Sequence, residues 1–493
     1  MKLLKTLIGK NWFIPVLLVA ALFLRTYRAS ELTGFYFDQG RDAKVIWDLW
    51  HAHKFFLIGP TTGIEGIFLG PFYYYLIAPF YILGNGNPVV VSWFLAFLNV
   101  VGIYVIYLTG KRFFSREAGI LAAFFITFSL QLTQAHRWLS NPTPLPFLTG
   151  IAVFSLLSLI HGSKSVRTWL VLGLSIGLGL QCEAASAVFF IPATLIIMVI
   201  YRRSIVWSWK TMVLAGVFIM TLLPQIYFNY RHDNILVNSF KHFLVSDRSF
   251  TPVLTDFYGK RLSFYFDAFS QKIMLDRSWA IVFFLVVLVL ISAKLKSLLN
   301  KPFIALMIIW ITPLIFLLFY HGNNGYVWDY YFTGVYSVFT LSLAVILVSA
   351  AKSGRYAKIA VGFLISIFLA TNLFHLRNYL SAGTDGPTDV VLGSSLKAVD
   401  WVYENVGNTP FNVDVYVPPV IPHAYDYLFL WRGTTKYHKL PDTVRRPLLY
   451  TLYEQDPPHP ERLAAWLKRQ AGIASPESRV GFGGITVQKR IRL

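Results

Sequence analysis

The chain has 493 residues, of which 55% are hydrophobic and only 14% are charged. A soluble protein of this length carries about a quarter of its residues as charges, so the composition excludes an ordinary soluble protein. The formal net charge of +20 would suggest a nucleic-acid partner in a soluble protein. Here much of the Lys and Arg lies in short loops between apolar runs, and no nucleic acid is expected.

The first apolar run, Trp12 to Leu24, follows a basic start that contains Lys2, Lys5 and Lys10. This arrangement also occurs in secretory signal peptides. The run is followed by Arg25-Thr-Tyr-Arg28 rather than by small residues at a cleavage position, which favours an uncleaved first span with a cytoplasmic N-terminus.

Apolar runs recur along the chain, and a run of about 20 residues is long enough to cross the roughly 30 Å hydrocarbon core as a helix. We predict about eleven spans, near 12–25, 88–109, 117–134, 144–160, 167–182, 184–201, 211–228, 279–296, 302–320, 332–350 and 358–376. Each of the five loops that this topology places inside is basic, as the positive-inside rule requires. The sequence thus predicts a multi-pass protein of the plasma (inner) membrane with a cytoplasmic N-terminus.

The first outer segment, 26–87, contains two apolar stretches that are not counted as spans. In Arg41 to His53, apolar residues recur at helical spacing. Phe68 to Leu83 is short, contains tyrosines at 73–75, and would reverse every later loop if it crossed the membrane. We therefore expect both to form juxtamembrane helices at the outer interface.

The second outer segment, 229–278, is unusually basic for an outer loop. Its Arg231, Lys260 and Arg261 are candidate phosphate ligands, because cationic side chains form the strong charge-assisted hydrogen bonds that bind phosphate. The alternative is a small domain with a salt-bridged surface.

The tail, 377–493, is less hydrophobic and richer in proline and charge than the preceding 376 residues. Phe411 to Val417 alternates like a strand, and helix signals follow at 392–405 and 461–470. We predict a transmembrane domain over 1–376 and a compact extracytoplasmic α+β domain over 377–493.

Several chemistries lack their sequence signatures. The chain contains neither GxxxxGK[ST] nor a strand-linked GxGxxG, which argues against an ATP-driven pump. It has no clustered His and Cys at zinc spacing, and its one cysteine, Cys182, permits no intrachain disulfide. A divalent metal is not indicated.

The segment Phe37-Asp38-Gln39-Gly40-Arg41-Asp42-Ala43 places two carboxylates and a guanidinium within five residues, directly after the first span. Leu69-Gly-Pro-Phe-Tyr-Tyr-Tyr-Leu-Ile-Ala-Pro79 follows it. Further along the chain come Arg137-Trp-Leu-Ser-Asn141-Pro142, Gln181, and Asp329-Tyr-Tyr331.

In order and placement these motifs resemble the polyprenyl-phosphate-sugar-dependent glycosyltransferases of family 39, which have the GT-C fold. That family includes protein O-mannosyltransferases and the lipid A aminoarabinose transferase. The resemblance covers about residues 1–376. It departs at Gln39, where many relatives have a second acid, at Gly70, where some have Lys or His, and at Glu183, where His is frequent.

The resemblance implies that Asp38 is the catalytic base and that Arg41 and Arg137, with Arg231, Lys260 and Arg261, hold the donor phosphate. Further residues in substrate-binding or supporting positions would be Asp42, Tyr73, Asn141, Gln181 and Tyr331. The expected reaction moves a sugar from a polyprenyl-phosphate donor, with inversion, to an acceptor outside the cytoplasm. A protein, lipid A and a polysaccharide are all possible acceptors. No ATP is needed, and a divalent metal is possible but not indicated.

Structural interpretations stay open for the same residues. Asp38 and Arg41 could form a local ion pair at a helix start, Arg137 could cap the third span, and the tyrosines could belong to an interfacial aromatic belt. Two other functions are a secondary transporter or lipid flippase, which would place ionisable residues near the midplane, and a receptor or scaffold with an outer domain.

Overall fold

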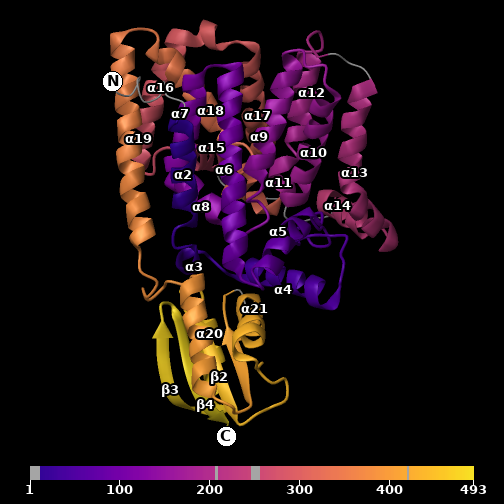
Figure 1. The fold of residues 1–493 in the computed structure, drawn as a ribbon, viewed down its shortest axis with the longest axis vertical. Coiled ribbons are helices and arrows are strands. Elements are labelled where there is room, and N and C mark those ends of the chain that lie inside the picture. Colours follow the sequence, from indigo (N-terminus) through magenta and orange to yellow (C-terminus); the bar gives the residue numbers. More distant parts are fainter. Residues whose placement is uncertain (1–11, 206–208, 246–255, 419–420, 493) are drawn as a thin grey trace.

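The computed structural model describes residues 12–205, 209–245, 256–418 and 421–492. Part of the predicted second outer loop, 246–255, and the basic start at 1–11 lie outside these ranges. The described helices form an upright bundle, and a small sheet with its own helices lies at one end of it (Figure 1).

The bundle and its connecting segments contain α2 (Phe13–Thr26), α3 (Ala29–Leu32), α4 (Phe37–Ala52), α5 (Phe72–Leu83), α6 (Pro88–Phe113), α7 (Arg116–Phe128), α8 (Leu130–Arg137), α9 (Leu145–Ile160), α10 (Val166–Cys182), α11 (Ala184–Ala187), α12 (Phe190–Ile200), α13 (Trp209–Arg231), α14 (Ile235–Val245), α15 (Phe257–Ser270), α16 (Arg277–Leu298), α17 (Lys301–Leu318), α18 (Tyr336–Ala351) and α19 (Arg355–Ser381). Two short 3₁₀ turns, η2 (Asn323–Gly325) and η3 (Asp329–Phe332), precede α18.

Every apolar run predicted as a span coincides with a helix or a broken pair of helices. Among the described residues, four helices (α6, α13, α17 and α19) are long and apolar enough to cross a membrane. The bent pair α7 and α8 makes five if it is one span, and the other apolar helices are shorter. The helical membrane fold is therefore confirmed, and the number eleven stays a prediction.

The chain bends by 69° between α7 and α8 because polar side chains replace the helix's own hydrogen bonds there. The Ser129 hydroxyl accepts from the Leu132 amide at 3.2 Å, as an N-cap does. The Asn372 amide oxygen on α19 accepts from the Leu130 amide at 2.9 Å. The second half of the predicted third span thus leaves the direction of the first.

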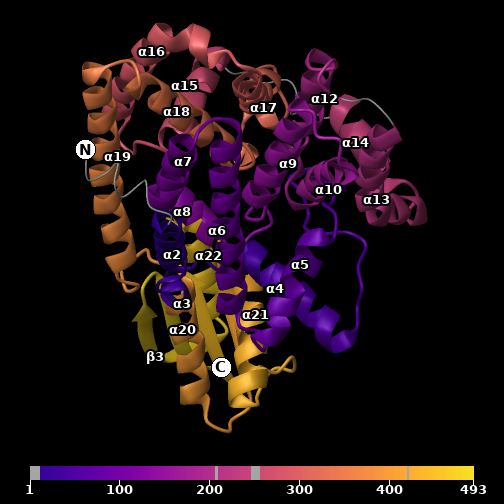
Figure 2. The same ribbon diagram turned by 45° about the horizontal axis from the view of Figure 1, so that its top comes forward.

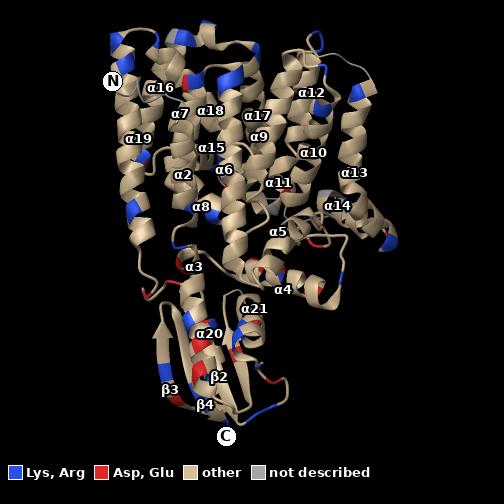
Figure 3. Ribbon diagram, viewed as in Figure 1, with Lys and Arg blue, Asp and Glu red and all other residues tan. Residues whose placement is uncertain are grey.

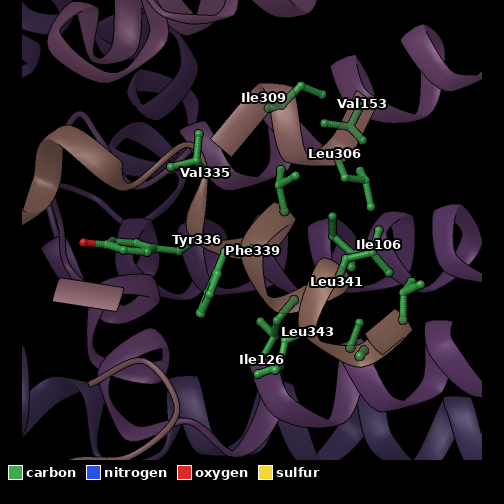
Figure 4. Packing of buried hydrophobic residues seen from close by; sticks show 14 of the residues in the cluster. Ile106, Ile126, Val153, Leu306, Ile309, Val335, Tyr336, Phe339, Leu341 and Leu343 are labelled. Carbon is green, nitrogen blue, oxygen red and sulfur yellow. The ribbon is translucent and has the colours of Figure 1, made fainter. Parts of the chain in front are cut away.

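The core of the bundle surrounds α18, which is buried along almost its whole length. Figure 4 shows Phe339, Leu341 and Leu343 of this helix among aliphatic residues of α6, α7, α9 and α17. A helix that is apolar on every face is stable only inside a bundle.

Charge is distributed unevenly between the two ends of the bundle. Figure 3 shows Lys and Arg gathered at the end far from the sheet, where the loops predicted to be cytoplasmic lie. This separation is the one that the positive-inside rule describes.

The C-terminal domain begins after α19 ends at Ser381, beyond the predicted end of the last span at 376. It contains α20 (Leu392–Val406), β1 (Phe411–Tyr416), α21 (His423–Arg432), the π-helical turn η4 (Gly433–Tyr437), β2 (Leu448–Glu454), α22 (Pro460–Ala471), β3 (Ala474–Phe482) and β4 (Ile485–Arg492). The strand order is β1-β2-β4-β3, with β1 and β2 parallel and the other pairs antiparallel. The predicted α+β tail is confirmed.

This domain packs directly on the first outer loop (Figure 2). One hydrophobic cluster joins Phe35, Trp47 and Tyr81 of the loop to Tyr427 and Trp431 of α21. The Tyr427 hydroxyl donates to the Gly86 carbonyl at 2.5 Å, and the Trp431 indole donates to the Asn85 carbonyl at 2.8 Å. The domain and the loop therefore share a core.

Candidate functional site

The helix that carries the acidic motif, α4, starts at a defined position. The Gln39 side-chain oxygen accepts from the Tyr36 backbone amide at 3.0 Å, which satisfies a group at the helix start. Gln39 is thus a buried capping residue. Asp38 lies in the first turn, where the helix dipole favours a negative charge.

Two carboxylates share one guanidinium on α4. Arg41 Nη1 lies 2.9 Å from Asp38 Oδ1, and Arg41 Nη2 lies 2.8 Å from Asp42 Oδ1. Arg41 also donates to the Thr61 hydroxyl at 3.0 Å. The Asp38 side chain is 51% exposed and that of Asp42 only 4% exposed, so one acid faces solvent and the other anchors the arginine.

The electrostatics of the buried acid follow from its position. Burial raises the pKa of Asp42 to about 6, although Arg41 and the Tyr74 hydroxyl, which donates to Asp42 at 3.0 Å, lower it. Burial lowers the pKa of Arg41, but the carboxylates of Asp42 and Asp38 reverse this and the net shift is upward. Arg41 is therefore a permanent cation held by an acid that titrates near neutrality.

The predicted Tyr73 is buried in α5, but the tyrosine that contacts the acidic motif is its neighbour Tyr74. The two side chains leave α5 about 100° apart, and it is the Tyr74 hydroxyl that donates to Asp42. The sequence does not give the rotation of α5 relative to α4, so it could not show which of the two tyrosines bonds to Asp42.

A second group of polar residues surrounds the break between α10 and α11. The buried Glu183 carboxylate caps α11 by accepting from the Ala185 amide at 3.1 Å. The predicted Asn141 donates to this carboxylate at 3.3 Å and to the Cys182 carbonyl at 2.7 Å. Asn141 therefore ties the turn before α9 to this break.

The predicted Gln181 lies two positions before Glu183 and links three helices. Its side-chain oxygen accepts from the Phe72 amide at the start of α5 at 3.0 Å, and its nitrogen donates to the Thr221 carbonyl of α13. A Cβ atom at Gly70 would lie 2.3 Å from the Gln181 side chain. Any larger residue at position 70 would therefore displace Gln181.

The turn η3 brings the last motif to the same end of the bundle. Burial raises the pKa of Tyr330, and the carboxylates of Glu183 and Asp38 add to the increase. Tyr330 is thus within electrostatic range of both acids. The predicted Tyr331 is buried and packs edge-on against the Tyr330 ring, with centroids 4.9 Å apart.

Lys272 and Asp329 form an ion pair beside η3 that the sequence analysis did not single out. The Lys272 ammonium is buried and lies 3.0 Å from Asp329, which also accepts from the Tyr336 hydroxyl at 2.6 Å. The partners are 57 positions apart, so no local spacing could have revealed the pair.

Two other predicted phosphate ligands, Arg137 and Arg261, donate to backbone carbonyls. Arg137 is buried and donates to the carbonyls of Leu24 and Tyr27 at the end of α2, at 2.9 and 3.0 Å. Arg261 is buried and donates to carbonyls of Leu317, Tyr320 and Gly325 after α17. Both guanidiniums thus compensate carbonyls at helix ends.

Arg231 ends α13 and Lys260 lies in the first turns of α15, and both are exposed. Their place in a phosphate site stays a prediction. In the described part of the chain, no group of three or more His, Cys, Asp or Glu residues is arranged to hold a metal ion.

The C-terminal domain approaches α4 beside the acidic pair. The ring of His423 lies 4.8 Å from that of Phe37. A Cβ atom at Gly40 would lie 2.3 Å from the His423 carbonyl group and the Ala424 nitrogen. Only glycine fits at this contact, and this glycine lies between Asp38 and Arg41.

Asp42 gives a test of the electrostatics. We expect the rate of the sugar transfer that the resemblance implies to fall as the pH is lowered through about 6. Protonation of Asp42 removes the negative charge that holds the Arg41 guanidinium. Asp42→Asn should lower activity throughout and abolish this acidic limb, which a pH profile of the initial rate measures. The effect on folding stability has the opposite sign. The pKa of Asp42 in the folded protein exceeds the ordinary 3.8. Asp42 therefore stabilises the fold most below pH 3.8, and this stabilisation is lost as the pH rises through about 6. An unchanged acidic limb in the variant would contradict the assignment.

Comparison with known proteins adds two findings. Residues 69–228, about a third of the chain, match the family model described as dolichyl-phosphate-mannose-protein mannosyltransferase. None of the curated proteins matches the sequence.

The structure is similar to several solved ones at low sequence identity. ArnT from Cupriavidus metallidurans bound to undecaprenyl phosphate matches with a TM-score of 0.60 and 10% identity, over 97% of this chain and 98% of ArnT. The Archaeoglobus fulgidus oligosaccharyltransferase matches with a TM-score of 0.52 and 15% identity, over 87% and 62% of the two chains. The arabinofuranosyltransferase AftD from Mycobacteria matches with a TM-score of 0.52 and 12% identity, over 98% of this chain and 40% of AftD.

Proposed function

The chain has the GT-C fold of membrane glycosyltransferases, and from this premise we propose that it is an inverting, polyprenyl-phosphate-sugar-dependent glycosyltransferase. The observation that carries the proposal is the half-exposed Asp38 carboxylate, held by Arg41 at the junction of the bundle and the C-terminal domain. The fold match to ArnT spans nearly the whole of both chains.

The donor class rests on the relatives' ligands. The matching family model names a dolichyl-phosphate sugar, and ArnT binds undecaprenyl phosphate. Both are polyprenyl phosphates. A sugar on such a lipid already has a good leaving group, so the reaction needs no nucleotide.

In the proposed step, a hydroxyl or similar nucleophile of the acceptor attacks the anomeric carbon as the bond to the lipid phosphate breaks. Asp38 takes the acceptor's proton, and polyprenyl phosphate leaves with the bonding electrons. Arg41 lies next to this carboxylate and places a fixed cation where the phosphate gains charge. One base and one displacement imply inversion.

We assign the site to the extracytoplasmic side. Basic loops gather at the opposite end of the bundle (Figure 3), and such loops stay in the cytoplasm. The N-terminus would then be cytoplasmic and the C-terminal domain outside.

Turnover tests the function directly. Purified protein in liposomes that contain a polyprenyl-phosphate sugar should release polyprenyl phosphate when an acceptor extract is added, without ATP. Labelled sugar should appear on the acceptor in equal amount. Movement of the intact donor between leaflets, without its cleavage, would instead identify a flippase.

Cysteine labelling tests the orientation, because the native Cys182 is buried. Ser478→Cys, on the exposed strand β3, should react with a membrane-impermeant maleimide in intact cells. Ser165→Cys, in the basic loop before α10, should react only after lysis. The reverse pattern would place the site in the cytoplasm.

A further inference from the structure

A cleft of about 1030 Å³ lies between α2, α7, α18 and α19, at the end of the bundle opposite the C-terminal domain (Figure 1). None of the residues assigned above to sugar transfer lines it. Most of its lining is apolar, contributed by Phe13, Ile120, Leu121, Phe124, Val348, Ala351, Val361, Ile365 and Leu369.

One end of the cleft is strongly basic. Lys352, Arg355 and Lys358 line it around the turn from α18 to α19. Glu117 is the one carboxylate among the lining residues and lies within electrostatic range of Lys352. Among the described residues, none of the three cations has a carboxylate within 4.0 Å, so three cations face one acid and the net charge of this end is positive.

The dimensions of the cleft match one leaflet of a bilayer. Its lining on α19 extends from Arg355 to Leu369, and the apolar part of it, from Val361 to Leu369, spans about 12 Å at a rise of 1.5 Å per residue. Half of the hydrocarbon core is about 15 Å thick. Cations at the surface and apolar walls below them are the arrangement that a phosphate headgroup with acyl chains requires.

The charge argues against an occupant from the chain itself. The first eleven residues, which precede α2, contain Lys2, Lys5 and Lys10 and no acid. They would add positive charge to a positive end. An apolar helix from a partner would leave the three cations unpaired.

We propose that this cleft binds an anionic phospholipid of the cytoplasmic leaflet, with its phosphate at Lys352, Arg355 and Lys358 and its acyl chains between α7 and α19. Basic pockets between helices on the cytoplasmic side bind anionic headgroups in other membrane proteins. The leaflet follows from the proposed orientation, but the lipid site does not depend on glycosyl transfer.

The experiment titrates delipidated, full-length protein in detergent with phosphatidylglycerol or phosphatidylcholine and measures bound lipid by native mass spectrometry. We expect phosphatidylglycerol to bind more tightly. A basic side chain near the surface contributes about fivefold to anionic-lipid affinity. The triple variant Lys352→Gln, Arg355→Gln, Lys358→Gln should therefore bind phosphatidylglycerol about a hundredfold more weakly, with phosphatidylcholine unaffected.

Two further variants keep the test independent of folding. Ser366→Trp fills the apolar part without altering charge and should weaken both lipids. The control Lys164→Gln, Arg202→Gln, Arg203→Gln removes three exposed cations from other basic loops and should bind as the native protein does.

Three results would overturn the proposal. An equal loss in the control triple variant would mean that overall charge, not this cleft, attracts the lipid. Competition by millimolar inorganic phosphate would assign the cations to a free anion. Displacement of phosphatidylglycerol from the cleft by lower concentrations of undecaprenyl phosphate would make the occupant a polyprenyl lipid.

Discussion

Asp38→Asn is expected to reduce sugar transfer by about 10²–10⁴-fold, the range that general-base catalysis contributes. The amide is nearly isosteric but cannot accept a proton from the acceptor. Because Asp38 is half exposed and its partner Arg41 keeps Asp42, the variant should remain folded. Initial rates with a polyprenyl-phosphate sugar donor, together with a thermal unfolding curve, measure both effects.

A matched control lies on the same helix. Asp48 pairs with Lys44 at 2.6 Å, four positions away, and is also partly exposed. Asp48→Asn removes a similar ion pair, worth about 0.3–0.5 kcal/mol on a helix surface, and should leave the rate unchanged. If Asp38→Asn transfers sugar as fast as the Asp48 variant, Asp38 is only a helix-start residue.

Gly40→Ala is expected to undock the C-terminal domain from α4. The added methyl group would lie 2.3 Å from the backbone of His423 and Ala424, and neither backbone can move aside as a flexible side chain could. Overpacking of this kind costs about 1–3 kcal/mol. The gain of about 1 kcal/mol from replacing a helical glycine by alanine is the same in docked and undocked molecules and does not change their ratio. The ratio of docked to undocked molecules should fall about 5- to 150-fold.

Limited proteolysis of the segment between α19 and α20, residues 382–391, measures this undocking. Gly362→Ala on α19 is the control, because a Cβ atom there meets no atom within 4 Å. It should be neutral or slightly stabilising. Equal protease resistance of the two variants would show that the added methyl group does not disturb the contact between α21 and α4, which contradicts the prediction.

Local spacing in the sequence was sufficient for part of this architecture. Apolar runs predicted the helices, and the three-residue separation of Asp38 and Arg41 predicted side chains on one helix face. The strand at Phe411 and two helices of the tail, at 392–405 and 461–470, were also predicted from local patterns, whereas α21 was not. These features depend on neighbours within one element.

Features that depend on tertiary placement could not be predicted in this way. Arg137 and Arg261 are chemically suitable for phosphate, but which carbonyls they reach depends on how α2 and α17 end. The ion pair of Lys272 and Asp329 joins two loops. The necessity of Gly40 becomes visible only when α21 lies against α4.

The core that Phe35 shares with Tyr427 has a consequence for biosynthesis. Since the two aromatic residues are separated by almost the whole chain, the ribosome releases the second long after the first has been inserted. The acidic motif therefore stays without the C-terminal domain packed on it until the last 70 or so residues have been synthesised. Translation stalled before that point would yield a membrane-inserted but immature precursor.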